Sequence, residues 1–286
     1  MSSPESKGLF HKVWAMSPSI GQLRTLPRAQ ELQTQFLEIA NVSSIDEVRA
    51  LSLDDMLAAQ AKQMAIPTTN FDFYTPTAGG SALPFDILSA AAQSPLPLVL
   101  GSNHDEDRLW SAFDPMQAEF GQHDWERVSG EVFGHRAADA RAVYEKHRPT
   151  ESPRQLISSV RTDTAFRQRA QRLAEAHTAA GNPTWMYWFT WATPAFGGIL
   201  GSCHALDVPF AFDNLSAPGT DMLTGDGSER SGIAKRFADE IVQFAKSSAP
   251  TWPAFDFAIR STLEINDEMA VLSDPEKEIR EIFLSL

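Results

Sequence analysis

Residues 96–103, LPLVLGSN, give the clearest indication of the fold. Residues 96–100 form a short apolar run with no polar side chain, and the run stops at Gly101. A run of this length that is apolar on both faces is typical of a central strand covered on both sides by helices. The sequence therefore predicts a buried strand here, followed at once by a loop that carries polar residues.

Two further apolar runs predict strands of the same sheet. Residues 184–191, TWMYWFTW, precede the glycine-rich loop GGILGSCHAL at 197–206, and residues 9–16, LFHKVWAM, precede the turn-like SPSIG. We expect the first of these strands to be buried and the second to end near Ser17.

Helical patterns lie between and after these runs. Residues 153–180 predict one long helix with Ser152 as its N-cap, and residues 230–246 predict an amphipathic helix. Segments 260–265 and 269–272 can pair as a hairpin. Ser44 with Glu47 predicts a capping box. Strands that alternate with helices predict an α/β sheet.

Composition narrows the range of functions. The 286 residues include 24 Lys and Arg against 37 Asp and Glu, which gives a net charge of −13. An acidic surface repels phosphate backbones and anionic lipids, so we expect neither nucleic acid nor membrane as a partner. The single cysteine, Cys203, excludes an internal disulfide framework and a cysteine-rich zinc site. The N-terminus shows no signal-like apolar run, and a cytoplasmic location is expected.

Two of the seven histidines follow predicted buried strands, where open α/β sheets place their functional groups. His104 comes directly after the 96–100 strand, and His204 lies in the glycine-rich loop after the 184–191 strand. His177 lies on the apolar face of a predicted helix, and we expect it to be a core residue.

The run His104–Asp107 has three interpretations. Four consecutive residues project in different directions and rarely converge on one ion, and no HExxH spacing is present, so we expect no metal and no cofactor. The plainest alternative is a solvated acidic turn. The third is that Glu106 turns inward and orients a histidine, as the acid of a catalytic triad does. Acid followed by histidine along the chain is the order found in α/β hydrolases.

Five segments resemble, in order, the C-terminal half of a type B carboxylesterase. The segments with acid and histidine are the most specific of the five, and together the five span nearly the whole chain. They are SPESKGLFHKVWAMSPS (3–19), the loop 73–83 ending in PTAGGSAL, LPLVLGSNHDED (96–107), WMYWFTW with GSCHALDVPFAFDNL (185–191 and 201–215), and WPAFDFAIRSTLEINDEMAVLSDP (252–275).

The resemblance implies roles for individual residues. Glu106 resembles the triad acid, His204 the general base, and Ser17 a serine that hydrogen-bonds the acid. Trp110 and Phe196 are expected to line the substrate pocket. Glycines that the family carries after these three residues are replaced here by Asp107, Ala205 and Pro18, which raises questions about local loop geometry.

The nucleophile is the main departure from the family pattern. The sequence contains no G-x-S-x-G elbow and no HGGG-type oxyanion loop. We therefore expect an incomplete α/β-hydrolase fold, namely the C-terminal half of a mixed, mostly parallel sheet with its covering helices. Residues 1–286 would form one partial domain, with residues 111–180 as an inserted helical cap.

The complete enzyme would hydrolyse small-molecule esters through an acyl-enzyme, whereas the chain alone would be inactive. Two alternatives stay open at this stage. The chain could be a non-catalytic binding module on an esterase scaffold. It could also be a complementing half that docks with a separate N-terminal half.

Overall fold

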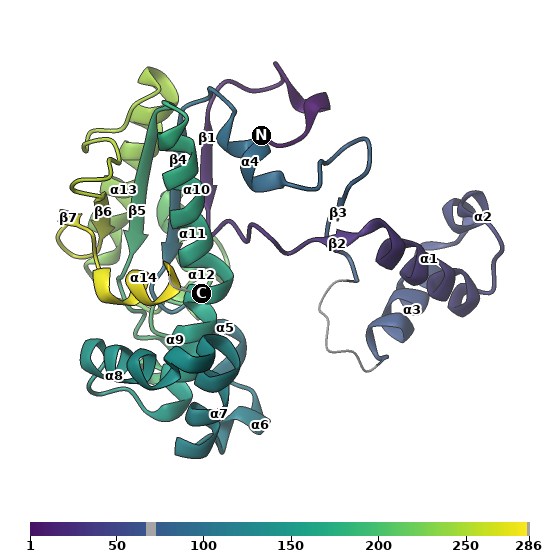
Figure 1. Ribbon diagram of the computed structural model, residues 1–286, viewed down its shortest axis with the longest axis horizontal. Helices are drawn as coiled ribbons and strands as arrows, with labels where there is room; N and C mark the ends of the chain where they lie inside the picture. The colour runs from purple at the N-terminus through teal and green to yellow at the C-terminus, as the bar shows by residue number, and fades with distance from the viewer. Residues whose placement is uncertain (67–72, 285–286) are drawn as a thin grey trace. The chain divides into compact units, whose positions relative to one another are not determined.

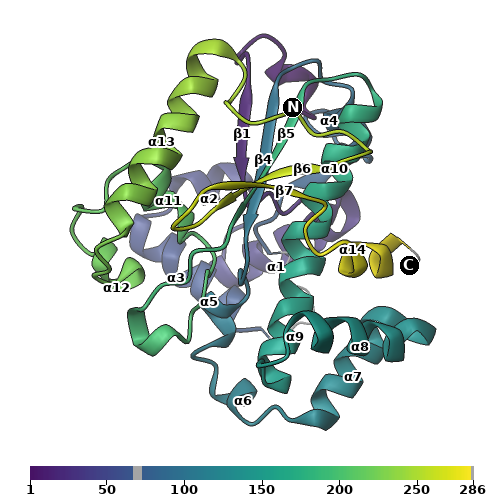
Figure 2. The same ribbon diagram turned by 90° about the vertical axis from the view of Figure 1, so that its left-hand side faces the viewer.

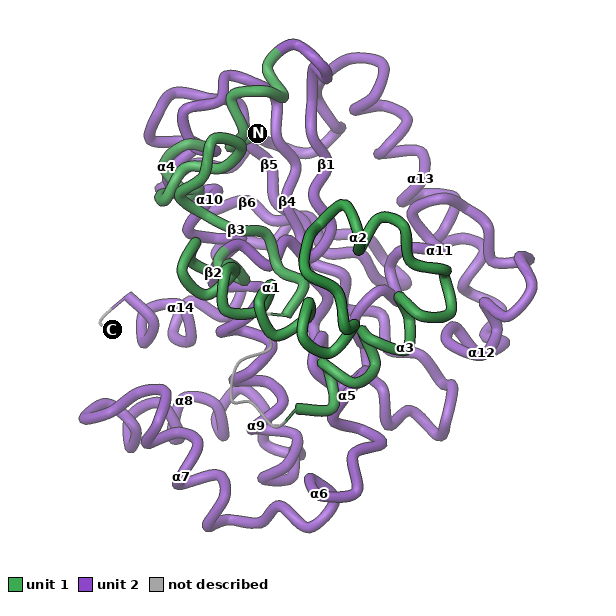
Figure 3. The backbone as a smooth tube through the Cα atoms, turned by 90° about the vertical axis from the view of Figure 1, so that its right-hand side faces the viewer, with its two compact units in different colours: residues 1–7, 21–90 green, residues 8–20, 91–286 purple. Residues whose placement is uncertain are grey.

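The computed structural model (Figure 1) describes residues 1–66 and 73–284. The chain divides into two compact units, residues 1–7 with 21–90 and residues 8–20 with 91–286 (Figure 3). The larger unit contains every residue for which a role at the site is expected.

A five-stranded sheet forms the centre of the larger unit, in the order β1-β4-β5-β6-β7 (Figure 2). The first four strands run parallel, and β7 pairs antiparallel with β6. The strands are β1 (Val13–Met16), β4 (Leu98–Asn103), β5 (Thr184–Phe189), β6 (Ser261–Ile265) and β7 (Ala270–Ser273). The mixed, mostly parallel α/β sheet predicted from the sequence is confirmed.

The strand predictions hold with shifted boundaries. Every residue of β4 and β5 is buried, as expected of strands covered on both faces. Strand β1 starts at Val13 rather than at residue 9, and it ends directly before Ser17. The predicted hairpin is formed by β6 and β7.

Helices cover the sheet on opposite faces, and Figure 1 shows α10 (Gln168–Ala179) and α13 (Arg230–Ser247) on its two sides. Trp185, Tyr187 and Phe189 alternate along β5 and share a core cluster with Phe237 of α13. On the α10 side, His177 is fully buried. Its two ring nitrogens lie 2.7 Å from Thr184 Oγ1 and 2.8 Å from the carbonyl of Ser94, which confirms it as a core residue.

The single helix predicted over residues 153–180 is wrong in its middle. The segment forms α9 (Pro153–Thr162), a π-turn over Asp163–Arg167, and α10. The predicted N-cap is present, because Ser152 Oγ accepts from the backbone N–H of Gln155. The wide turn brings buried polar side chains against neighbouring helices, and Asp163 accepts a 2.6 Å hydrogen bond from the Tyr144 hydroxyl. Such bulges often lie at functional sites.

The remaining helices of the larger unit include those that occupy most of residues 111–180. They are α5 (Arg108–Ser111), α6 (Pro115–Ala118), α7 (Gln122–Phe133), α8 (Ala137–His147), α11 (Asp207–Ala211), α12 (Thr220–Thr224) and α14 (Lys277–Leu284).

The smaller unit is mostly helical. It contains the short parallel strands β2 (Arg24–Thr25) and β3 (Thr77–Ala78), with α1 (Leu26–Ala40), α2 (Ile45–Ala50), α3 (Leu53–Met64) and the start of α4 (Ile87–Ala92). Ser44 caps α2 as predicted, but the Glu47 carboxylate accepts from the backbone N–H of Ser43 instead of Ser44. The reciprocal half of the capping box is thus shifted by one residue. No helix in the described parts of the chain is long and apolar enough to cross a bilayer.

Candidate active site

Three polar residues meet where three neighbouring parallel strands end. Ser17 directly follows β1, Glu106 lies three residues beyond β4, and His204 lies in the loop after β5. Because the carboxyl ends of parallel strands share one edge of a sheet, these loops converge. The structure therefore brings together the three residues that the resemblance singled out.

Glu106 is fully buried, and its carboxylate accepts three hydrogen bonds. The Ser17 hydroxyl and the Asn103 backbone N–H donate to Oε1 at 2.5 Å and 2.7 Å. His204 Nδ1 lies 2.5 Å from Oε2. The backbone of His204 also donates to the Glu106 carbonyl at 3.2 Å, so main chain and side chain tie the two loops together.

The contact with Glu106 sets the state of His204. A carboxylate can only accept, so Nδ1 carries the proton and Nε2 is left with a free lone pair in the neutral ring. Burial lowers the pKa of His204, but the hydrogen bond and the negative charge of Glu106 outweigh it, and the pKa lies above its ordinary value. The side chain keeps 30% of its surface exposed, so the ring can be reached from outside.

Aromatic rings flank the imidazole. Trp110 and Phe166 have ring centroids 5.0 Å and 5.1 Å from that of His204. Trp110 is half-exposed, consistent with a place beside a ligand. Phe196, the other expected pocket residue, is also half-exposed but packs edge-on against Phe113 at 5.2 Å. Sequence reasoning missed the role of Phe166 because the π-turn that brings its ring to His204 was not predicted.

Backbone geometry shows what the loss of the family's glycine means at two positions, Ala205 and Asp107. Ala205 has a φ of +63°, in the left-handed region that costs a residue with a Cβ roughly 1–2 kcal/mol. Asp107 has a φ of −64° and needs no glycine. Ser17 itself has a φ of +48°, and its N–H donates to the Gly101 carbonyl at 2.8 Å. The strain thus lies on either side of the Glu106 carboxylate, at Ser17 and next to His204.

A second buried carboxyl, Asp207, lies close behind this arrangement. The Tyr187 hydroxyl donates to Asp207 Oδ2 at 2.9 Å, and Asn103 Nδ2 lies 3.4 Å from Oδ1. Burial and the nearby charge of Glu106 raise the pKa of Asp207 to about 6. No sequence signal identifies this residue, because an aspartate in the first turn of a helix is ordinarily exposed.

Replacing Asp207 with asparagine tests this burial through its pH dependence. The folded pKa of about 6 exceeds the unfolded value of roughly 3.9, so the fold binds the proton more tightly, and wild-type stability falls as pH rises from about 4 through 6. Asparagine mimics the protonated acid. We expect the free energy of unfolding of D207N to exceed that of the wild type by up to about 3 kcal/mol at pH 8 and by almost nothing at pH 4. Urea unfolding measures both values.

The exposed Asp239, which pairs with Lys235 on the surface of α13, provides the control for this experiment. D239N should change the free energy of unfolding by less than about 0.5 kcal/mol at both pH values. A D207N effect that is equal at pH 4 and pH 8 would contradict the assigned burial.

The solvated acidic turn considered for residues 104–107 is wrong, because Asp105 as well as Glu106 is buried. Asp105 Oδ1 lies 3.0 Å from both His104 Nδ1 and a terminal nitrogen of Arg108, and Oδ2 accepts from the Ser202 N–H at 2.9 Å. Burial opposes ionisation, but His104 and Arg108 hold the pKa of Asp105 well below its usual range.

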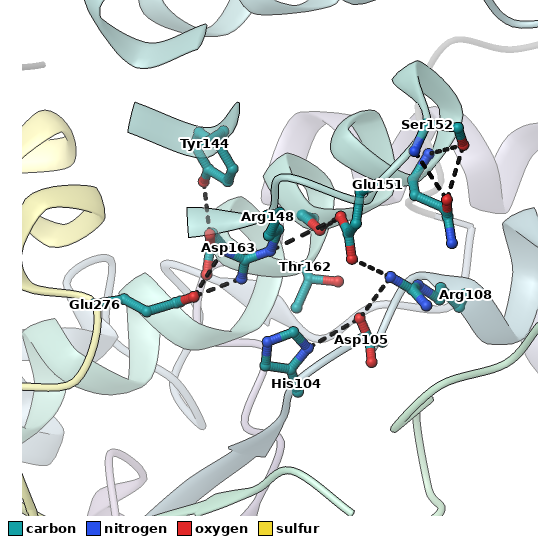
Figure 4. A network of polar contacts seen from close by, with 12 residues as sticks. His104, Asp105, Arg108, Tyr144, Arg148, Glu151, Ser152, Thr162, Asp163 and Glu276 are labelled. Carbon is teal, nitrogen blue, oxygen red and sulfur yellow. Dashed lines mark hydrogen bonds and ion pairs between the residues drawn. The ribbon is translucent and has the colours of Figure 1, made fainter. Parts of the chain in front are cut away.

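Figure 4 shows the network that these contacts begin. Arg108 also pairs with Glu151, and Arg148 and Arg167 both bind Glu276, which follows β7. These pairs connect the loop after β4 with α8, α9 and the π-turn. In the described residues no three His, Cys, Asp or Glu side chains converge as metal ligands.

Comparison with known proteins assigns the family. Residues 1–281 match the carboxylesterase family. The para-nitrobenzyl esterase of Bacillus subtilis is 29% identical, over 98% of this chain and 58% of its own length. The phenmedipham hydrolase of Pseudarthrobacter oxydans is 26% identical, over 93% of this chain and 56% of its own length.

Solved structures of carboxylesterases also resemble this chain. A carboxylesterase of Geobacillus stearothermophilus superposes with a TM-score of 0.81 at 25% identity, over 98% of this chain and 60% of that structure. A para-nitrobenzyl esterase structure gives a TM-score of 0.77 at 24% identity. The chain thus spans less than two thirds of the length of the proteins that it resembles.

Proposed function

The chain belongs to the carboxylesterase family and has an α/β-hydrolase fold, and on that premise we propose that it supplies the acid and the base of a serine ester hydrolase. The observation that carries the proposal is the 2.5 Å contact between Glu106 Oε2 and His204 Nδ1 at the carboxyl edge of the sheet. This contact leaves Nε2 free to take a proton, which is the arrangement that a general base needs.

In the proposed reaction His204 Nε2 removes the proton from a serine hydroxyl as the serine oxygen attacks the ester carbonyl. The tetrahedral intermediate collapses, and His204 returns the proton to the departing alkoxide, leaving an acyl-enzyme. Water then attacks the acyl group by the same proton transfers and releases the carboxylic acid. Throughout, the Glu106 carboxylate stabilises the imidazolium and keeps the proton on Nδ1.

The nucleophilic serine and the oxyanion hole are proposed to come from polypeptide outside these 286 residues, because the sequence holds neither motif. That polypeptide would be either an N-terminal part of a longer chain or a separate half. Strand β1 forms one edge of the described sheet and offers a place for a further strand. Residues 1–286 would then be one partial domain, with the helices in 111–180 as its cap.

The substrate is proposed to be a small-molecule carboxylic ester, as the names of the relatives suggest. Trp110 contacts the His204 ring and would border the bound ester. Phe196 would lie farther out, together with Phe113.

Reconstitution tests the proposal. The chain is fused to, or expressed with, the N-terminal segment of Bacillus subtilis para-nitrobenzyl esterase that carries the serine elbow; this assembly is referred to below as the restored enzyme. We expect the restored enzyme to hydrolyse p-nitrophenyl butyrate, measured by release of p-nitrophenol. The isolated chain should be no faster than buffer, because triad members act as a unit.

Size-exclusion chromatography shows whether the parts assemble, and a serine-to-alanine variant of the added segment controls for contaminating esterase. Two results would overturn the proposal. One is ester hydrolysis by the isolated chain, and the other is an assembled, folded complex that hydrolyses no ester.

A further inference from the structure

A cavity lies beside the candidate active site, in the same unit. Its volume is about 260 Å³. Arg108 and Ser111 of α5 form one wall, Arg154, Gln155 and Ser158 of α9 form another, and Ile199 closes it from the loop after β5. None of its lining residues is acidic.

The lining carries hydrogen-bond donors and positive charge. One terminal nitrogen of Arg108 contacts both Asp105 and Glu151, and its Nε is buried without a partner among the described residues. Arg154 donates to the carbonyls of Ser111 and Ala112, and no described carboxylate lies within ion-pair distance of it. The Arg154 guanidinium is therefore bound to neutral carbonyls, and the carboxylate of Asp114, whose pKa Arg154 helps to lower, balances its charge only from beyond ion-pair distance.

Gln155 adds a further donor. Its Oε1 accepts from both the backbone N–H and the hydroxyl of Ser152 at 2.9 Å, which fixes the amide and leaves its NH₂ group to donate. Figure 4 shows Ser152 on the same side of the network as Arg108. A group that only accepts hydrogen bonds and carries negative charge suits this lining.

We propose that this cavity binds the carboxylate of a small organic acid. Guanidinium groups match the planar, two-oxygen geometry of a carboxylate. The volume lies below the range of typical drug-sized pockets and suits an acid of a few carbon atoms.

The cavity shares helix α5 with the candidate active site, and this suggests that its ligand takes part in ester hydrolysis. This step rests on the proposed function. Helix α5 carries Arg108 into the cavity wall and Trp110 against the His204 ring. Two sources would supply a carboxylate there. One is a second acid group on the substrate itself, as in the half-ester of a dicarboxylic acid. The other is a free acid, which every ester hydrolysis releases.

Calorimetric titration of the isolated chain with succinate tests the site without any catalysis. We expect saturable binding at one site. R154Q should weaken it at least tenfold. I199E should do the same, because it places a negative charge at the cavity wall, and Ile199 is 40% exposed so the variant should fold. The control R161Q removes another arginine of α9, one that binds Gln117 and does not line the cavity, and should change the affinity less than twofold.

Absence of saturable succinate binding, or unchanged affinity in both R154Q and I199E, would overturn the proposal.

The restored enzyme then distinguishes the two sources of the carboxylate. If the acid belongs to the substrate, R154Q raises the KM for monomethyl succinate but not for methyl butyrate. If it is a free acid, succinate inhibits the wild type and not R154Q. If neither effect occurs although succinate binds, the link to ester chemistry is wrong. Succinate binding without any ester hydrolysis would refute the proposed function alone.

Discussion

In the restored enzyme, replacement of His204 by alanine should lower kcat for p-nitrophenyl butyrate by about 10⁶-fold, while KM changes little. The imidazole is the group placed to take the serine proton, because Nδ1 is held by Glu106 at 2.5 Å and Nε2 is free. Alanine removes both proton transfers of the cycle. What remains is the catalysis that an oxyanion hole and substrate binding provide by themselves.

An exposed histidine provides the matched control. His123 lies near the start of α7 with its side chain in solvent, so H123A should keep kcat within twofold of the wild type. Circular dichroism of both variants separates loss of chemistry from loss of fold. A decrease of less than tenfold in folded H204A would mean that another group acts as the base.

Replacement of Glu106 by glutamine should lower kcat of the restored enzyme by about 10⁴-fold. The side chain keeps its shape but loses its charge, so the imidazolium formed during proton transfer is no longer stabilised. The glutamine NH₂ group must also face Ser17 Oγ, the Asn103 N–H or His204 Nδ1, all of which donate to Glu106. The histidine would then take the wrong tautomer.

Glu264 serves as the control carboxylate. It lies on β6, the strand next to β5, and accepts a hydrogen bond from Thr190. E264Q should alter kcat less than threefold. If E106Q retained more than a tenth of the wild-type kcat while folded, the acid of the triad would have to be another residue. Asp207, the other buried carboxyl near His204, would then be the first to examine by D207N.

The sheet could be predicted from the sequence because an apolar run begins or precedes each of its central strands. Strands β4 and β5 are buried on both faces, and their apolar runs located them to within a few residues. The pairing of Glu106 with His204 could not be derived from periodicity, since both lie in loops. It came from the family resemblance, which fixes the order of acid and histidine.

Other parts of the site depend on contacts between residues far apart in sequence. Asp105 is buried because His104, Arg108 and Ser202 satisfy it, and nothing in an acidic run distinguishes that from a solvated turn. Phe166 reaches His204 through a π-turn that interrupts a pattern typical of one helix. Asp207 is identified only by the hydroxyl and amide groups that bind it.

The tautomer of His204 tests the central claim most directly, and it needs only the isolated chain. Nitrogen-15 NMR is recorded at a pH above the pKa of His204, and its signals among the seven histidines are assigned with H204A. The account predicts a protonated Nδ1 and an unprotonated Nε2, with the balance shifting toward the Nε2–H form in E106Q. A native chain already in the Nε2–H form, or the same tautomer in both proteins, would contradict the claim that Glu106 prepares His204 to act as a base.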